Sequence, residues 1–485
     1  MTITPMGQIL TDLAAADPHR VALVCGDQEA TRAELESRAN RLARSYAEMG
    51  VTKGDLVTVG LPNGIEFYEV CFALWKLGAT PQPVSWRLPD REREQIVELA
   101  NPPIVVGVEG SSAGRPNVPP SFEPDSALSD APMAPQVAPA WRAMTSGGST
   151  GRPKLIVTVR PRGEFDTSSS MLKMLPHQTQ LVAGPLYHSA PFNSMYGLFI
   201  GQRLVIMPKF DPVEALHLIE REHIGFAQFV PTMLQRMWRV LEQEQSRWDL
   251  SSLETVWHMA APCPVWLKQA WIDLIGAEKL WELYAGSEGQ SVTCISGVEW
   301  LDHEGSVGRP LFGELKVVDE AGRAVPPGTL GEVYLRRSAD GVKTYYYVGA
   351  QARSLPDGWE SLGDMGWVDT DGFLYLTDRL SDMVLSGGAN IYPAEVEAAI
   401  LEHPHVLTCA VVGLPDTDLG QRVHAVVQAT GNVSAEDLSA FVNQRLVRYK
   451  VPRSFRFVDH SVRDDAGKVR RSQVREQEIA LHEAG

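Results

Sequence analysis

The sequence lacks the features of several protein classes. Its 485 residues include only five cysteines, which are scattered and form no C-x-x-C pair, so we expect reduced thiols and neither a disulfide framework nor a zinc site. No apolar run approaches the roughly 20 residues that a membrane span needs. The N-terminus also lacks the basic and then apolar pattern of a secretory signal. These absences predict a cytoplasmic protein without a membrane span.

Basic charge is scarce. The chain has 44 Lys and Arg against 60 Asp and Glu, which gives a net charge of −16 at pH 7. No basic cluster with interleaved aromatic residues offsets this balance, so nucleic acid and anionic membranes are disfavoured as partners. The 44% hydrophobic and 21% charged residues are ordinary for a soluble globular protein, and the length allows more than one domain.

Strands alternate with helices along the chain, which predicts an α/β architecture with partly parallel sheets. Residues 111–140 differ, because seven prolines lie among Ser, Ala and Asp. We expect that segment to be a surface loop that does not separate domains. Hydrophobic periodicity predicts helices over 6–16, 31–49, 65–77, 394–402 and 435–446, and strands over 56–61, 104–108, 331–336, 373–376, 406–412 and 423–429.

Residues 146–154 form a loop rich in glycine and hydroxyl side chains that ends in Pro153-Lys154. Glycine lets a backbone approach a ligand closely, and hydroxyl and backbone N–H groups can surround phosphate oxygens. The Walker spacing is absent, because Pro153 intervenes and Leu155 follows the lysine. The loop therefore indicates a different kind of nucleotide site, with a plain surface turn as the alternative. Its candidate phosphate contacts are Ser146, Gly147, Gly148, Ser149, Thr150, Gly151 and Lys154.

Four more blocks follow this loop in order, at Leu283–Glu288, Trp359–Gly366, Thr377–Glu397 and Asp465–Arg471. Together they resemble the signature set of the adenylate-forming superfamily, which includes acyl-CoA synthetases, peptide-synthetase adenylation domains and luciferases. The resemblance covers residues 17–475. It implies a large N-terminal domain, residues 1–380, with mixed and parallel sheets flanked by helices and a β-barrel-like subdomain. Residues 381–485 would form a small mobile α+β domain.

The resemblance also implies how charge is arranged for chemistry. An acyl-adenylate forms when a carboxylate attacks the α-phosphate of ATP, and two anions can meet only where positive charge is supplied. Lys468 would enter the site from the small domain and bridge the two groups, although a solvated lysine is the alternative for the Gly-Lys turn alone. Glu288 would bind Mg²⁺, which takes few protein oxygens. The implied adenosine contacts are Ala260, Ala261, Pro262, Tyr284, Ala285, Gly286, Ser287, Asp364 and Arg379.

The same resemblance implies an acyl pocket and a path for CoA. His188 would gate the pocket, a partly buried histidine with satisfied hydrogen bonds being the alternative. An apolar wall would protect the mixed anhydride from water. After adenylation the small domain would rotate, withdraw Lys468 and bring Ser386, Gly387 and Gly388 to a pantetheine tunnel. The implied pocket residues are Tyr187, His188, Phe192, Asn193, Phe229 and Gly286.

Two segments bear on specificity and on the second step. The pivot of that rotation is usually Asp or Lys, but Ser381 stands there and Asp382 follows. Residues 258–264 (His-Met-Ala-Ala-Pro-Cys-Pro) look like a subgroup that acts on bile acids, steroid side chains and related polycyclic acids. They favour a bulky cyclic acid, steroidal or terpenoid.

The leading prediction is an ATP-dependent acid–CoA ligase that uses Mg²⁺, ATP and coenzyme A and releases AMP and pyrophosphate. An enzyme that hands acyl-AMP to a carrier protein or partner enzyme is the alternative, which the altered pivot keeps open. A non-catalytic acyl-AMP-binding protein is disfavoured by retention of Lys468, Glu288, Asp364 and Arg379. A homodimer is left open.

Overall fold

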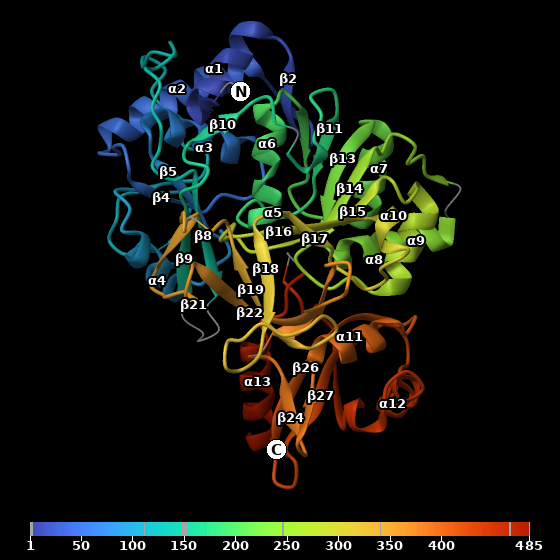
Figure 1. The fold of residues 1–485 in the computed structure, drawn as a ribbon. Coiled ribbons are helices and arrows are strands. Elements are labelled where there is room, and N and C mark those ends of the chain that lie inside the picture. Colours follow the sequence, from blue (N-terminus) through green and yellow to red (C-terminus); the bar gives the residue numbers. More distant parts are fainter. Residues whose placement is uncertain are drawn as a thin grey trace.

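Figure 1 shows the computed structural model, which describes residues 3–110, 112–147, 153–169, 171–244, 247–339, 341–379, 381–464 and 467–484. A large body occupies the upper part of the view, and the chain from residue 384 onward forms a smaller unit below it. Of the predicted phosphate loop, Gly148, Ser149, Thr150 and Gly151 lie outside the described residues. Across the described part of the chain, no helix is both long and apolar enough to cross a membrane.

The largest sheet has nine strands and forms the centre of the body. Most of its inner strands pair in parallel, and antiparallel strands lie at both edges. In order across the sheet they are β17 (Arg309–Phe312), β16 (Val292–Ser296), β15 (Leu280–Ala285), β14 (Thr255–Met259), β13 (Ile224–Phe229), β11 (Thr179–Val182), β12 (Arg203–Ile206), β2 (Val21–Cys25) and β3 (Gln28–Thr31).

Helices cover both faces of this sheet, which explains why β13 and β14 are buried at every position. One hydrophobic core lies between the sheet and the N-terminal helices, and a second lies under the helices of residues 212–275. The first group is α1 (Met6–Ala16), α2 (Arg32–Glu48), α3 (Ile65–Leu77), α5 (Ser189–Phe192) and α6 (Ser194–Phe199). The second is α7 (Pro212–Arg221), α8 (Pro231–Glu244) and α9 (Val265–Ile275), with the short α10 (Gly297–Trp300) beside it.

Smaller sheets complete the body. A parallel sheet joins β5 (Thr80–Pro83), β4 (Leu56–Val59), β6 (Val105–Val106) and β7 (Asn117–Val118), flanked by α4 (Asp90–Ala100). A three-stranded antiparallel sheet joins β20 (Tyr345–Val348), β9 (Pro153–Thr158) and β8 (Arg142–Gly147). Another holds β18 (Glu314–Val318), β19 (Gly331–Arg336), β22 (Trp359–Val368), β21 (Arg353–Leu355) and β23 (Leu374–Arg379). The pair β1 (Ile3–Pro5) and β10 (Glu164–Asp166) lies apart. The two antiparallel sheets of three and five strands lie in the large body, for which a barrel-like subdomain was expected.

The smaller unit has its own hydrophobic core, built around Val396, Val411, Val427 and Leu438. Its sheet runs β25 (Ala389–Ile391), β24 (Val384–Ser386), β27 (Gly420–Ala429) and β26 (Val406–Asp416), with β28 (Ser454–Val458) parallel to β27. The helices are α11 (Pro393–Leu401), α12 (Ala435–Asn443) and α13 (Arg471–Ala484). The predicted domain boundary falls between β23 and β24, and it stays a prediction.

Strongly periodic segments agree with the sequence predictions. The predicted helix 65–77 is α3, which ends at Gly78 in the left-handed conformation (φ 72°), as a glycine C-cap requires. The prediction for residues 111–140 is wrong in one respect. Val118 belongs to β7 and is 2% exposed, and Ala138 is buried in the first core. A strand of two residues is too short to show alternating hydrophobic and polar residues. The prolines therefore decided the prediction of a loop.

Candidate active site

Glu288 lies in the turn that follows β15, beside the three-stranded sheet. It is 5% exposed. Its Oε1 accepts a hydrogen bond from the Tyr347 hydroxyl at 2.6 Å and lies 3.8 Å from Lys154 Nζ. Its Oε2 accepts no hydrogen bond from the described residues, and a Cβ at Gly286 would lie 2.5 Å from that oxygen. A carboxylate with one free oxygen over a glycine fits a magnesium ion that takes its other ligands from phosphate and water.

Tyr347 is a site residue that the sequence reasoning missed. Besides its hydrogen bond to Glu288, its ring lies 3.9 Å from Lys154 Nζ, a cation–π contact. Burial lowers the pKa of Lys154, and the charge of Glu288 acts in the opposite direction. The run Tyr345-Tyr346-Tyr347 was a usable signal, because alternate residues of a strand share a face.

Tyr284, Asp364 and Arg379 come together across three strands. The Tyr284 hydroxyl donates to Asp364 Oδ2 at 2.6 Å, and Arg379 Nε donates to Asp364 Oδ1 at 3.2 Å. Burial and then the Asp364 charge raise the pKa of Tyr284 well above its ordinary value. The Asp364 charge likewise raises the pKa of Arg379. The structure therefore brings together three residues that are spread over 95 positions of the sequence, from Tyr284 to Arg379.

The phosphate loop joins the ends of a β-hairpin. Ser146 pairs with Lys154, and Gly147 with Pro153, in the β8–β9 register. Ser146 and Lys154 are therefore neighbours across the hairpin, and Lys154 Nζ lies 3.8 Å from Glu288 Oε1. The hairpin's Thr158 hydroxyl donates to the Ser287 carbonyl at 3.4 Å, which ties the hairpin to the turn after β15.

The predicted adenine slot follows β14. Ala260 has φ 73°, a left-handed conformation that turns the chain sharply after the strand. Ala261 is half-buried and Pro262 exposed. Met259 pairs with Leu283, so this turn lies next to the end of β15 that carries Tyr284 and Ala285. The residues predicted to form the slot are thus adjacent, and their role in binding adenine stays a prediction.

His258, from the same block, lies away from the slot. It is fully buried, with Nε2 at 3.7 Å from Glu282 Oε2, and Lys268 Nζ lies 2.6 Å from that same oxygen. Burial lowers the pKa of His258 to about 4. A neutral histidine inside the second core therefore belongs to the packing under α9.

The acyl-pocket prediction holds only in part. The rings of Tyr187 and His188 lie 4.5 Å apart and both side chains are half-buried. Phe192, however, has no exposed surface and packs edge-on against Phe67, Trp75 and Trp141. The assignment of Phe192 to the wall of the acyl pocket is therefore corrected, because its ring is buried in an aromatic core.

Phe229 and Asn193 are likewise engaged within the protein. Phe229 is nearly fully buried in the second core. Asn193 Oδ1 accepts a hydrogen bond from Arg142 Nη1 at 3.0 Å. Phe229 ends β13, and Asn193 follows α5, the short helix that begins directly after His188.

The Lys468 turn is fixed by hydrogen bonds. The backbone N–H of Lys468 donates to Asp464 Oδ1 at 2.9 Å, and the Asp464 N–H returns a bond to the Lys468 carbonyl. Arg463 Nη1 donates to the Gly467 carbonyl at 3.1 Å. Gly467 has φ 73°, and a Cβ there would lie 2.6 Å from Thr232 Oγ1 on α8, so the turn presses against the large body.

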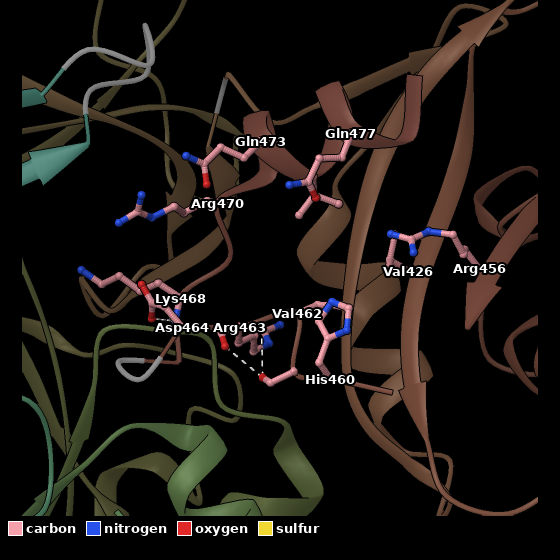
Figure 2. Close-up of a pocket in the computed structure, with 12 residues that line it drawn as sticks. Val426, Arg456, His460, Val462, Arg463, Asp464, Lys468, Arg470, Gln473 and Gln477 are labelled. Atoms are coloured by element: carbon pink, nitrogen blue, oxygen red, sulfur yellow. Dashed lines mark hydrogen bonds between the residues drawn. The ribbon is translucent and has the colours of Figure 1, made fainter. Parts of the chain in front are cut away.

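Lys468 stands close to the other charged residues of the site. Its side chain reaches water, yet surrounding protein lowers its pKa and Arg379 lowers it further, while Glu288 acts the other way. The ammonium group of Lys468 is thus in contact with solvent although protein surrounds much of its side chain. Figure 2 shows Lys468 and Arg470 reaching away from α13 at one side of a 260 Å³ pocket.

His188 is neutral in this setting. Burial lowers its pKa to about 3, and the charges of Lys468 and Arg470 act in the same direction. The charge of Lys468 thus acts on His188, and the charges of Arg379 and Glu288 act on Lys468.

The glycine hairpin does not join this group. Gly387 and Gly388 connect β24 to β25, and the Gly387 N–H donates to the Leu419 carbonyl within the smaller unit. Strand β24, which ends at Ser386, lies toward the lower end of the molecule in Figure 1, below the large body. The Ser381 hydroxyl donates to Asp382 Oδ1 at 3.1 Å, and Asp382 Oδ2 accepts from Arg471 Nη1 at 2.9 Å.

Comparisons with known proteins agree with this arrangement. Residues 10–347 match the AMP-binding enzyme family, and residues 395–468 match the AMP-binding enzyme C-terminal domain. The chain belongs to the AMP-binding enzyme family. An AMP-forming acid–thiol ligase of α/β fold, with a large and a small domain, is thereby confirmed.

The relatives include ligases that join CoA to aromatic acids and to long-chain fatty acids. The chain is similar to a feruloyl-CoA synthase of an Amycolatopsis species (32% identical, covering 95% of this chain and 96% of the relative). It is also similar to a 2-succinylbenzoate–CoA ligase of Bacillus licheniformis (29%, 96% and 98%). The o-succinylbenzoate CoA synthetase of Bacillus subtilis, solved with its acyl-adenylate, superposes with a TM-score of 0.83 (27% identical, 98% of each chain). The same synthetase has been solved with ATP and magnesium.

Proposed function

We propose that this chain activates a cyclic carboxylic acid with ATP through an acyl-adenylate and then transfers the acyl group to CoA. The observation that carries the proposal is the cluster in which Lys154 lies 3.8 Å from buried Glu288 while Asp364 links Tyr284 and Arg379. A lysine, an arginine and one buried carboxylate are the charges that adenylation needs.

In the first step an acid carboxylate oxygen attacks the α-phosphorus of ATP. The new P–O bond gives acyl-AMP, and the bond to the β-phosphate breaks with its electron pair leaving on pyrophosphate. Lys468 neutralises charge between carboxylate and α-phosphate, and Lys154 does so at the outgoing phosphates. Arg379 and Asp364 hold the ribose. Neutral His188 adds no charge beside the acyl carboxylate.

Glu288 would hold Mg²⁺ through its free Oε2, with Tyr347 and Gly286 shaping the space around it. When bound, the ion would neutralise phosphate charge. The protein's own contribution is orientation, because the Tyr347 hydroxyl fixes one oxygen of Glu288 and leaves the other available. A second carboxylate is not required, since Mg²⁺ takes most of its ligands from phosphate and water.

In the second step a thiolate attacks the acyl carbonyl and AMP leaves. Ser386, Gly387 and Gly388 would line the CoA path after the smaller unit rotates about Ser381 and Asp382. A second candidate is transfer of acyl-AMP to a carrier protein or partner enzyme. It is favoured by Ser381, whose hydroxyl bonds to Asp382 in place of the usual charged pivot.

The acid is the least determined part of the proposal. The residues 258–264 favour a steroidal or terpenoid acid, whereas the named relatives act on ferulate and 2-succinylbenzoate. A cyclic acid is common to both lines of support.

Pyrophosphate release with ATP and Mg²⁺ tests the proposal, using ferulate, 2-succinylbenzoate, a fatty acid, a bile acid and a diterpenoid acid, each with and without CoA. Acyl-AMP and acyl-CoA are followed by mass spectrometry. Acyl-CoA from a cyclic acid supports the full ligase. Acyl-AMP that accumulates despite CoA supports the second candidate, and no pyrophosphate from any acid contradicts both.

A further inference from the structure

One side of helix α8, in the large body, lies against the smaller unit. Thr232, Gln235 and Arg239 are spaced by three and four residues, so they share one face of the helix. A Cβ added to Gly467 would lie 2.6 Å from Thr232 Oγ1, so the turn that carries Lys468 lies beside this face. The opposite face contributes to the second core with Met233, Leu234, Met237 and Leu241. The polar face of α8 is thus a contact surface for the smaller unit.

Gln235 and Arg239 both donate to backbone carbonyls of the smaller unit. Gln235 Nε2 donates to the Leu401 carbonyl at 3.5 Å, and Arg239 Nη2 donates to the Val406 carbonyl. Gln235 is only 4% exposed, so its contact is shielded from water. Leu401 is the last residue of α11, where helix carbonyls have no partner within the helix. Two donors of α8 therefore meet the end of α11 and the start of β26.

Asp378 makes the complementary contact at the other end of α11. Its Oδ2 accepts a hydrogen bond from the Ala394 N–H at 2.7 Å, in the first turn of the helix. The helix has no side-chain cap of its own, because its N-cap residue is Tyr392, which makes no capping hydrogen bond. Asp378 belongs to β23, before the predicted pivot. A carboxylate at the start of a helix and donors at its end both complement the helix dipole.

Arg236 provides the contrast on the same helix. Its side chain is exposed, and its guanidinium carbon lies 5.2 Å from the centre of the Phe210 ring, which also belongs to the large body. Arg239 is more enclosed, and burial lowers its pKa. The two arginines thus differ in their contacts and not in their chemistry. Arg236 contacts a ring of the large body, whereas Arg239 binds the smaller unit.

We propose that the large body clamps helix α11 at both ends and so holds the smaller unit in the orientation that presents Lys468 for adenylation. Asp378 forms one end of the clamp, and Gln235 and Arg239 form the other. The inference rests on the proposed two-step function. Rotation of the smaller unit for CoA transfer breaks these hydrogen bonds, so they stabilise the first orientation alone. The three are positioning residues, because they act on the reaction through the placement of Lys468.

The test measures the two half-reactions separately in wild type, Arg239→Met, Arg239→Lys, Gln235→Leu and the matched control Arg236→Met. Adenylation is followed as pyrophosphate release at saturating ATP and acid, and CoA transfer is followed from synthetic acyl-AMP. We expect adenylation to fall about tenfold in Arg239→Met and about threefold in Gln235→Leu, because fewer molecules then hold the adenylating orientation. CoA transfer should be unchanged or faster. Arg239→Lys should retain part of the lost rate.

Two results would overturn the proposal. One is an equal loss of both half-reactions in Arg239→Met, which would assign the residue to the stability of the fold. The other is an adenylation rate in Arg239→Met that matches that of Arg236→Met, which we expect to behave as wild type.

Hydrogen exchange measured by mass spectrometry separates this inference from the proposed function, because it needs no turnover. Wild type, Arg239→Met and Arg236→Met are compared at residues 401–406, at the turn that carries Lys468, and in β27, which lies in the core of the smaller unit. Faster exchange at the first two segments in Arg239→Met alone, with β27 unchanged, supports the clamp even if no acid is activated. Faster exchange in β27 as well, or no change at 401–406, would overturn the clamp and leave the ligase intact.

Discussion

The two sides of the candidate active site are built by different means. Tyr284 lies in β15 and Glu288 follows that strand, in a sheet that helices cover on both faces, so hydrophobic packing fixes them. Lys468 lies on a turn of the smaller unit, which ion pairs hold at the boundary. Arg471 reaches Asp382 at 2.9 Å, Glu397 at 3.0 Å and, across the boundary on β23, Asp378 at 3.6 Å.

This difference suits a site with one fixed and one movable side. Rearranging a close-packed core costs much free energy. A few ion pairs near water are individually weak, so they can break and form again with other partners. Contacts across the boundary are mostly polar, such as Arg470 with Glu92 at 3.2 Å. We therefore expect changes on the Glu288 side to affect nucleotide binding, and changes on the Lys468 side to affect adenylation selectively.

Lys468→Ala should produce the largest effect. Removing one preorganised charge partner lowers adenylation by about a hundredfold or more. CoA transfer from supplied acyl-AMP should survive, because the fixed side is untouched. Pyrophosphate release and acyl-CoA formation from synthetic acyl-AMP measure the two steps separately. Lys450→Ala is the matched control, since the ion pair of Lys450 among the described residues is with Glu395 in the same unit. Equal loss of both steps would contradict the division into sides.

The secondary structure was predictable where a regular hydrophobic pattern continued over a whole helix or strand. Helix 65–77 and strand 331–336 agree with their elements, because burial on one or both faces leaves a clear pattern. Strand β6 was predicted as five residues and has two, since Gly107 turns the chain at φ 78° after Val106. Element ends depend on such local turns, which periodicity does not record.

The site was predictable where a motif carried it, and not where topology did. Tyr284, Asp364 and Arg379 were named from their blocks, and the structure joins them. Tyr347 belongs to no block and reaches the site through the pairing of β20 with β9. Phe192 fitted the motif, but the aromatic core that buries it is assembled from distant helices.

Tyr347→Phe should give the next largest effect, now on the fixed side. It removes a hydrogen bond to a charged group, which is worth about 1.5–3 kcal/mol, so we expect about a tenfold rise in the Mg²⁺ concentration needed for half-maximal pyrophosphate release. Tyr345→Phe is the control, because the Tyr345 hydroxyl donates to Glu360 instead. An unchanged magnesium requirement would remove Tyr347 from the metal site.

The pH dependence of adenylation should reveal the protonation of Lys468, which lies on the movable side of the site. Protein surroundings and Arg379 lower the pKa of Lys468, so this lysine is charged below that pKa and loses its charge as pH rises through it. The kcat/KM for pyrophosphate release should therefore fall several-fold at alkaline pH. His188 adds no limb near neutrality, since its pKa of about 3 leaves it neutral there. In Lys468→Arg, whatever activity remains should lack the alkaline fall. A persistent fall would assign that limb to another group.

Asp382→Asn should give the smallest effect and the sharpest test of the boundary. It breaks the pair with Arg471, whose partial exposure limits its worth to about 1 kcal/mol or less. We expect adenylation to fall about two- to threefold, with CoA transfer unchanged or faster, because Arg471 then holds the hinge less firmly. Ser381→Ala, which removes only the bond to Asp382 Oδ1, should change the ratio of the two steps less. Added salt should lower the rate of wild-type adenylation toward that of Asp382→Asn. If adenylation and CoA transfer fall in parallel, the ion pair stabilises the whole fold and not one arrangement of the two units.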